Sequence, residues 1–187
     1  PEIYDQVDPS KIRKQWNIPK DTLLFGIIAT MLWFKGHDIL IEAFQRMRES
    51  YQTIKLMIVG GAQGVPEQVK YEAALKTKVH QIGLFDDIIF TGWQENALDY
   101  LAAFDVFVFP PNKPDSLPTT LIHASALRKP IISTRVGGIP EIIIDQETGF
   151  VLEPDRVDQV VNAMKTFIQD PELRLKLGEK ARERYLN

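Results

Sequence analysis

The features that decide the fold lie in residues 114–141, whose sequence is PDSLPTTLIHASALRKPIISTRVGGIPE. A loop with an acidic residue leads into a proline-started helix, then a β-branched strand, and then a glycine pair that opens a second helix. Pro118 suits the first helical position, so we expect the amides of Thr119 and Thr120 to be free at the helix end. Free amides and the positive end of the helix dipole form an anion site. The same features also fit a capped helix and a tight turn in any α/β core.

Outward from this stretch, short apolar runs alternate with helical patterns along the chain. The expected strands are residues 23–30, 54–59, 88–91, 106–109, 131–134 and 150–152. The expected helices are residues 10–17, 37–50, 68–79, 96–103, 118–127, 139–144, 157–169 and 171–185. About six strands that alternate with helices predict a doubly wound, Rossmann-like parallel α/β sheet. Ligands of such sheets bind outside the carboxyl ends of the strands, so we expect the site in the loops that leave them.

Composition restricts the possible functions. The chain has 187 residues, 44% of them hydrophobic, which is enough for one domain with a substantial core. Its formal charge of -3 gives no general attraction to nucleic acid. It has no cysteine, which excludes disulfides and thiolate metal sites and agrees with a reducing cytoplasm. The longest apolar run, residues 23–34, is shorter than the roughly 20 residues that span a bilayer.

The chain begins with a segment that differs from the rest. Residues 1–9 are polar and bounded by prolines, so we expect an extended arm or an interdomain linker. Residues 10–187 form the expected folded domain. The first residue is Pro1 rather than methionine, so we interpret the chain as an excised fragment or a processed chain. No charged-then-apolar leader opens it, so we expect a protein that acts in the cytoplasm or at the inner face of the membrane.

Motifs for other kinds of site are poor or absent. His37 and His80 have no metal-ligand partner at a useful spacing, and the sequence has no Asp-x-Asp pair, so we expect no metal site. The glycines of residues 60–64 follow a strand but lack the G-x-G-x-x-G spacing, and there is no G-x-x-x-x-G-K-[ST] motif.

The order of the remaining motifs resembles the carboxyl-terminal domain of GT-B glycosyltransferases, in particular glycosyltransferase family 4. The resemblance covers nearly the whole chain, and it is the joint order of the motifs that is specific. The motifs are FKGHD (34–38), IEAF (41–44), LMIVGG (56–61), FTG (90–92), FDVFVFP (104–110), DSLPTTLIHASA (115–126), VGGIPE (136–141) and TGFV (148–151).

The resemblance implies which residues bind a nucleotide-diphosphate sugar of the UDP or GDP type, with no metal or other cofactor. The donor-sugar contacts are Asp115, Ser116 and Leu117, the phosphate contacts are Lys35, Thr119 and Thr120, and the nucleotide contacts are His123, Gly92, Trp93 and Gly61. No catalytic residue is identified.

Two positions depart from the family pattern. His123 stands where the family has a glutamate that holds the ribose, and the positions where the family has a diphosphate-binding arginine are occupied by Thr30, Met31 and Leu32. A carboxylate accepts two ribose hydroxyl bonds, whereas a neutral imidazole accepts one and donates one. His123 is therefore either a ribose ligand or a core histidine bonded to a backbone carbonyl. Trp93 either stacks on the base or packs in the fold, and Lys35 also fits an ordinary surface lysine.

The resemblance implies the donor-binding half of a retaining glycosyltransferase that transfers a sugar to a glycan or lipid-linked acceptor. We expect a role in surface polysaccharide synthesis such as that of O-antigen. The amino-terminal acceptor domain would precede Pro1 and would carry any membrane contact, and the isolated domain would be inactive. Two alternatives remain open: a non-catalytic nucleotide-binding module, and an isomerase or hydrolase of nucleotide sugars on the same architecture.

Overall fold

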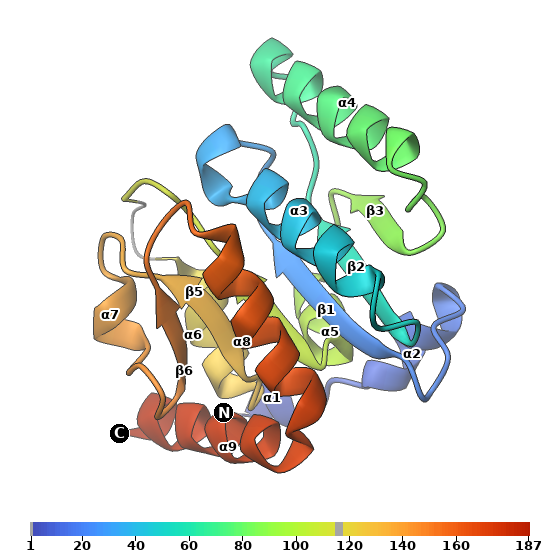
Figure 1. Cartoon of the computed structure of the whole chain (residues 1–187). Helices are drawn as coiled ribbons and strands as arrows, with labels where there is room; N and C mark the ends of the chain where they lie inside the picture. Colours follow the sequence, from blue (N-terminus) through green and yellow to red (C-terminus); the bar gives the residue numbers. More distant parts are fainter. Residues whose placement is uncertain (1, 115–117) are drawn as a thin grey trace.

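The computed structural model describes residues 2–114 and 118–187. Strands of the described residues form one parallel sheet in the order β3-β2-β1-β4-β5-β6, with helices on both faces (Figure 1). The strands are β1 (Leu23–Ile28), β2 (Ile54–Val59), β3 (Ile88–Gly92), β4 (Val106–Phe109), β5 (Ile131–Thr134) and β6 (Gly149–Leu152). The predicted doubly wound α/β fold is confirmed.

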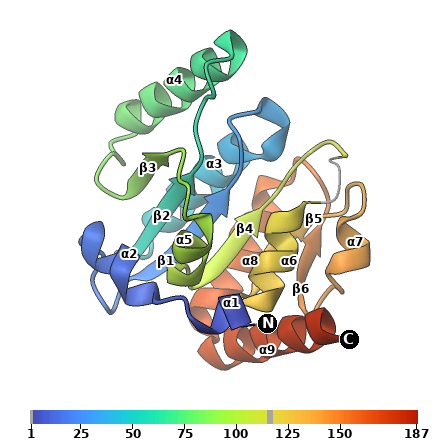
Figure 2. The same ribbon diagram turned by 180° about the vertical axis from the view of Figure 1, so that it is seen from behind.

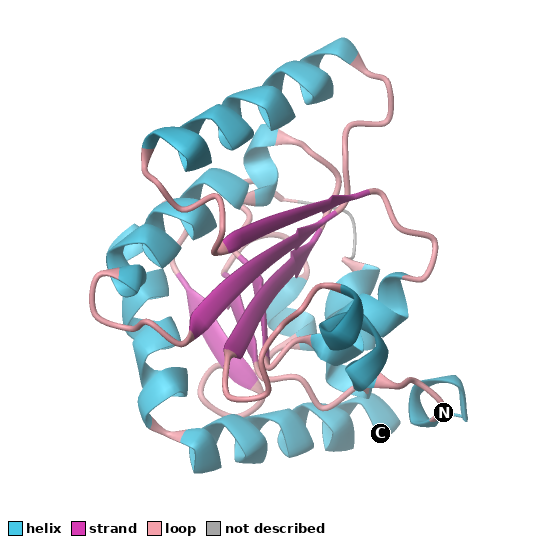
Figure 3. Cartoon of the chain, turned by 90° about the vertical axis from the view of Figure 1, so that its right-hand side faces the viewer, coloured by secondary structure: helices cyan, strands magenta, loops and turns pink. Residues whose placement is uncertain are grey.

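Helices cover the sheet in two layers, which the front and back views show (Figures 1 and 2). Helices α3 and α8 pack together on one face, and α5 packs beside α2 and α6 on the other. Helix α9 packs against α6 and runs across the end of the molecule that carries both termini (Figure 3). The helices are α1 (Glu2–Asp5), α2 (Pro9–Gln15), η1 (Trp33–Lys35), α3 (His37–Arg48), α4 (Pro66–Gln81), α5 (Ala97–Ala103), α6 (Thr119–Ala126), α7 (Ile139–Ile142), α8 (Val157–Gln169) and α9 (Pro171–Leu186).

Strand β1 lies at the centre of the sheet, between β2 and β4. Its near-continuous apolar sequence, LLFGII, is typical of a strand that is covered on both faces. Gly26 interrupts this run because the ring of Phe104 lies where a β-carbon would be, with its nearest atom 2.2 Å from that position. The ring thereby packs directly against the backbone of the central strand.

The amino-terminal segment differs from the sequence-based expectation. Residues 2–5 form the helical turn α1 rather than an extended arm, because Tyr4 packs against the rings of His123 and Tyr185. A single turn is not stable by its local sequence, so tertiary contacts stabilise it. Helix α2 begins at Pro9, one residue before the expected start, and Asp8 caps it by accepting a hydrogen bond from the Ser10 amide at 2.8 Å.

Two boundaries near the expected site also differ. Pro118 occupies the cap position of α6 instead of the first helical position, with an extended ψ of 95°. Strand β1 ends at Ile28, two residues before the expected end, because the chain turns into the loop that leads to η1. Among the described residues, no helix has both the length and the apolar sequence needed to cross a membrane.

Candidate functional site

The crevice at the carboxyl ends of β1 and β4 is the natural ligand position of this fold. The strands on either side of this pair are connected in opposite directions, so the loops after β1 and β4 diverge there. We call residues 29–36 the β1 loop and residues 110–114 the β4 loop. They are joined by a hydrogen bond from the Asn112 amide to the Phe34 carbonyl, at 3.0 Å.

Gly36 allows these two loops to approach each other. It has a φ of 82°, which side-chain-bearing residues rarely adopt, and a β-carbon on it would lie 2.0 Å from the carbonyl oxygen of Pro110. Any other residue would both strain the backbone and push the loops apart. The crevice is thus bordered by two loops in direct backbone contact.

A cavity of about 230 Å³ opens at the carboxyl ends of β1, β2 and β3. It brings together predicted site residues that are far apart in the sequence, together with three polar residues that we did not predict. Its lining includes Thr30, Gly61, Gln63, Trp93, Gln94 and Thr120. We call this the β1–β3 cavity.

Two backbone segments in close contact, one after β2 and one at the end of β3, form the floor of the β1–β3 cavity. The Gly60 amide donates to the Gly92 carbonyl at 2.9 Å, which closes the ends of β2 and β3 together. Gly61 is buried, and a β-carbon on it would lie 3.1 Å from the Trp93 amide nitrogen. The Trp93 indole is 63% exposed, so it offers a free face at the edge of the cavity. Gly92 contributes its carbonyl to this closure but does not itself line the cavity.

Polar groups stand around this floor. The side-chain amide of Gln94 donates to the Thr91 carbonyl at 2.9 Å, which leaves its own carbonyl oxygen able to accept. Glu72 on α4 accepts a hydrogen bond from the Ala62 amide at 2.7 Å, so it fixes the loop after β2. Burial opposes ionisation of Glu72, but hydrogen bonds from Lys76 and Ala62 outweigh it and hold the pKa of its carboxyl below the usual value.

The start of α6 faces the same region. Thr120 lines the β1–β3 cavity, and Thr119 is exposed. The described hydrogen bonds include none donated by the amides of Thr119 or Thr120, whereas the Leu121 amide bonds back to Pro118. Residues 115–117, which directly precede Pro118, lie outside the described part of the chain, so the free amides of Thr119 and Thr120 stay a prediction.

Two lysines lie on the loops that border the crevice. The Lys35 ammonium, half-buried on η1, lies 5.3 Å from the ring centre of Phe34 and 5.8 Å from that of Phe109. The Lys113 ammonium lies 4.2 Å from the ring centre of Trp33. The sequence analysis singled out Lys35 and not Lys113, because an exposed lysine in a proline-rich loop has no distinguishing pattern.

His123 does not line the β1–β3 cavity. Its Nδ1 lies 2.7 Å from the hydroxyl of Tyr4, and burial lowers the pKa of its ring. It faces a separate cavity of about 420 Å³ that is shared by α1 and the start of α5. For the alternative of a core histidine, the backbone-carbonyl partner is wrong at Nδ1, because the partner there is a tyrosine hydroxyl 119 residues away.

His37 lies directly behind the β1 loop. Its side chain is fully buried, and burial lowers its pKa to about 4 even though the carbonyls of Ala29 and Leu32 face it. Neither carbonyl makes a hydrogen bond of good geometry with the ring. The described residues contain no cluster of three or more His, Cys, Asp or Glu side chains that could hold a metal ion. Of the remaining predicted residues, Asp115, Ser116 and Leu117 lie outside the described part of the chain.

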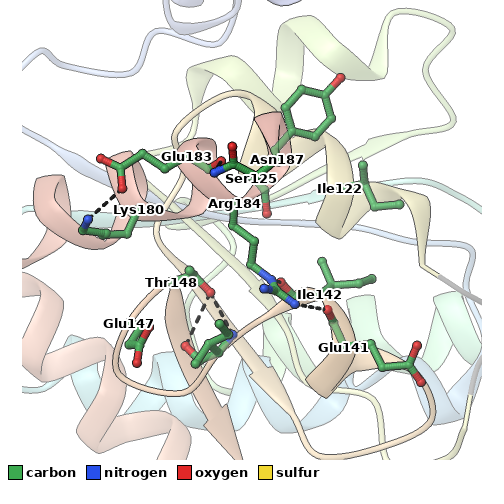
Figure 4. Close-up of a pocket in the computed structure, with 12 residues that line it drawn as sticks. Ile122, Ser125, Glu141, Ile142, Glu147, Thr148, Lys180, Glu183, Arg184 and Asn187 are labelled. Carbon is green, nitrogen blue, oxygen red and sulfur yellow. Dashed lines mark hydrogen bonds and ion pairs between the residues drawn. The ribbon is translucent and has the colours of Figure 1, made fainter.

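A larger cavity, about 810 Å³, lies between α6, α7 and α9 (Figure 4). Arg184 closes one side of it by donating to the carbonyls of Glu141 and Ile142, and Lys180 pairs with Glu183 at 2.7 Å. It reaches Thr148, which precedes β6, so it lies toward the amino end of that strand. Its position toward the amino end of β6 separates it from the crevice.

Comparison with known proteins identifies the family and the fold of the chain. The family model described as "Glycosyl transferases group 1" matches residues 8–184. The chain is 28% identical over 181 residues to N-acetyl-alpha-D-glucosaminyl L-malate synthase of Bacillus anthracis, covering 97% of this chain and 45% of that protein. It is 27% identical over 186 residues to lipopolysaccharide 1,2-N-acetylglucosaminetransferase of Salmonella typhimurium, covering 97% and 48%.

A solved structure shows the same fold. Anabaena Alr3699/HepE in complex with UDP and glucose superposes with a TM-score of 0.87 at 21% identity, over 95% of this chain and 46% of that chain. The chain thus spans about half the length of the curated relatives that it matches.

Proposed function

The chain belongs to the family of group 1 glycosyl transferases, and we propose from this premise that it is the donor-binding domain of a glycosyltransferase that uses a nucleotide-diphosphate sugar. The supporting observation is that predicted site residues from distant parts of the sequence lie together beside the crevice. Gly61, Trp93 and Thr120 meet at one cavity, and Lys35 stands on the loop beside it.

We propose that the nucleotide base enters the β1–β3 cavity. Gly61 lets the base approach the backbone, and the exposed face of Trp93 is placed to stack on it. The Gln94 carbonyl oxygen supplies an acceptor for a ring N–H. Gly92 acts through the backbone that closes the cavity, and His123 is the proposed ribose ligand once its ring leaves Tyr4.

The diphosphate would then lie toward Lys35 and the start of α6. The amides of Thr119 and Thr120 at the start of α6, together with the positive end of the helix, would favour an anion there. These groups would stabilise the negative charge that develops on the leaving diphosphate during sugar transfer. Asp115, Ser116 and Leu117 are the proposed contacts of the donor sugar.

The whole protein is proposed to have two domains and to act with retention of configuration. Residues 1–9 would link residues 10–187 to an amino-terminal domain that binds the glycan or lipid-linked acceptor and carries any contact with the inner membrane face. The lipopolysaccharide enzyme among the relatives supports a role in surface polysaccharide synthesis. A crevice that closes between two domains positions both substrates and excludes water, so this domain alone would be inactive.

Calorimetric titration of the chain with UDP, GDP and ADP tests the proposal. We expect saturable binding of at least one nucleotide, and Trp93→Ala should weaken it about tenfold, the order found for loss of one base–aromatic stack. Phe85→Ala is the matched control, because Phe85 is 55% exposed and precedes β3 at the opposite end of the strand.

Absence of saturable binding by all three nucleotides would contradict the donor-site proposal. Binding without transfer by the full-length protein would favour the non-catalytic module instead. Turnover of a nucleotide sugar without any acceptor would favour the isomerase or hydrolase alternative.

A further inference from the structure

Each of the two loops at the crevice carries one lysine. Lys35 lies in residues 29–36 and Lys113 in residues 110–114, and these two ranges contain no other charged side chain; Asp115 follows the second range directly in the sequence. The loops are joined through Asn112 and Phe34, so both lysines belong to one rim of the crevice. The strand topology places this rim where a ligand of a doubly wound sheet binds.

An aromatic ring, not a carboxylate, holds Lys113. Its ammonium lies 4.2 Å from the ring centre of Trp33, whose side chain is 51% exposed. Within the described part of the chain, no acid lies within ion-pair distance of Lys113. Asp155, which contacts the β4 loop, accepts a hydrogen bond from Asn112 at 2.8 Å.

This arrangement keeps the lysine charge available. A cation over an indole face is attracted by about 0.5–1 kcal/mol at an exposed site, which orders the side chain without neutralising it. An anionic ligand can therefore compete for the ammonium at little cost. A carboxylate partner would have had to be displaced.

We propose that Lys113 is a second diphosphate-binding residue, which acts from the β4 loop while Lys35 acts from the β1 loop. This inference rests on the proposed donor site and adds a residue to it. A diphosphate carries several negative charges, and ammonium groups on two sides bind it as point charges. The Trp33 face is the resting position of the Lys113 side chain when no ligand is bound.

Titration of the chain with UDP and with uridine tests this role, because the two ligands differ by the diphosphate. Lys113→Gln should weaken UDP binding about tenfold and leave uridine binding unchanged. It should also reduce the dependence of UDP affinity on salt, since one charge contact is lost. Lys113→Arg should restore most of the UDP affinity.

Lys176→Gln is the matched control, because Lys176 is exposed on α9 and the same charge is removed. It should leave UDP affinity unchanged. Equal loss of UDP affinity in both glutamine variants would show a general charge effect and overturn the inference. Wild-type UDP affinity in Lys113→Gln would also overturn it, while the donor-site proposal would stand if Lys35→Gln weakens UDP. A chain that binds neither UDP nor uridine would contradict both proposals.

Discussion

The hydroxyl of Tyr4 lies 2.7 Å from Nδ1 of His123, so a residue of the first helical turn holds a side chain in the middle of α6. Arg182 supports the contact from α9, with its guanidinium 6.0 Å from the ring centre of Tyr4 and 5.5 Å from that of Tyr185. The amino-terminal segment is thus fixed at the ring that occupies the predicted ribose-binding position.

We expect Tyr4→Phe to lower the free energy of unfolding by about 1 kcal/mol, because it leaves a half-buried imidazole nitrogen without its partner. Urea denaturation of Tyr4→Phe, His123→Leu and the double variant measures the coupling between the two side chains. The effects should fall short of additivity by about 1 kcal/mol. Additive effects would show that the contact contributes nothing to stability.

We expect His123→Glu to tighten UDP binding, because a carboxylate can accept hydrogen bonds from both ribose hydroxyls. We expect UDP affinity to rise about tenfold, which is the order of magnitude for two such hydrogen bonds after the loss of the Tyr4 contact is subtracted. Calorimetric titration with UDP checks the change, and His80→Glu on the exposed surface of α4 provides the control. If His123→Glu binds UDP with unchanged affinity, the side chain at position 123 does not contact the ribose.

We expect stability to fall in acid because of His37. Burial lowers its folded-state pKa to about 4, below the usual value of 6.5, so the unfolded chain binds the proton first. The contribution of neutral His37 to the free energy of unfolding is complete above about pH 6.5 and is lost as the pH falls toward 4. Its size is on the order of 2–3 kcal/mol. Urea denaturation from pH 7 to 4 should show a shallower decline for His37→Met than for the wild-type chain. Parallel declines would exclude His37 as the cause.

We expect Glu72→Ala to weaken the binding of UDP and of uridine equally, by about fivefold, because the loop after β2 loses the acceptor of its Ala62 amide. Glu72→Gln retains a side-chain oxygen at that position and should keep most of the affinity. Calorimetric titration with both ligands distinguishes this positioning role from a phosphate contact. Selective loss of UDP affinity would show that Glu72 acts on the diphosphate instead.

The sheet could be predicted closely because its signal is local. The predicted bounds of β2, β4 and β5 match the structure, since each is a short apolar run between polar or turn residues. Gly61, Trp93 and Thr120 could also be placed together, because parallel strands end at a common edge.

Contacts between distant segments could not be predicted in the same way. The partner of His123 comes from a helical turn that has no local signal and that depends on packing against α6 and α9. The position of Lys113 over Trp33 depends on how two loops meet, which no periodicity records. Asp8 is the cap residue of α2 because Pro9 occupies the first helical position. The apolar pattern alone did not determine at which of these neighbouring residues the helix begins.

The contact between Gly36 and Pro110 has a consequence for how variants of this protein are interpreted. Two independent constraints, the left-handed backbone and the missing space, both exclude a side chain at position 36. In a saturation-mutagenesis library, position 36 should therefore tolerate as few substitutions as a ligand-binding residue does, although its role is only to allow two loops to come into contact. Intolerance there would report on the spacing of the crevice walls, not on recognition of the substrate.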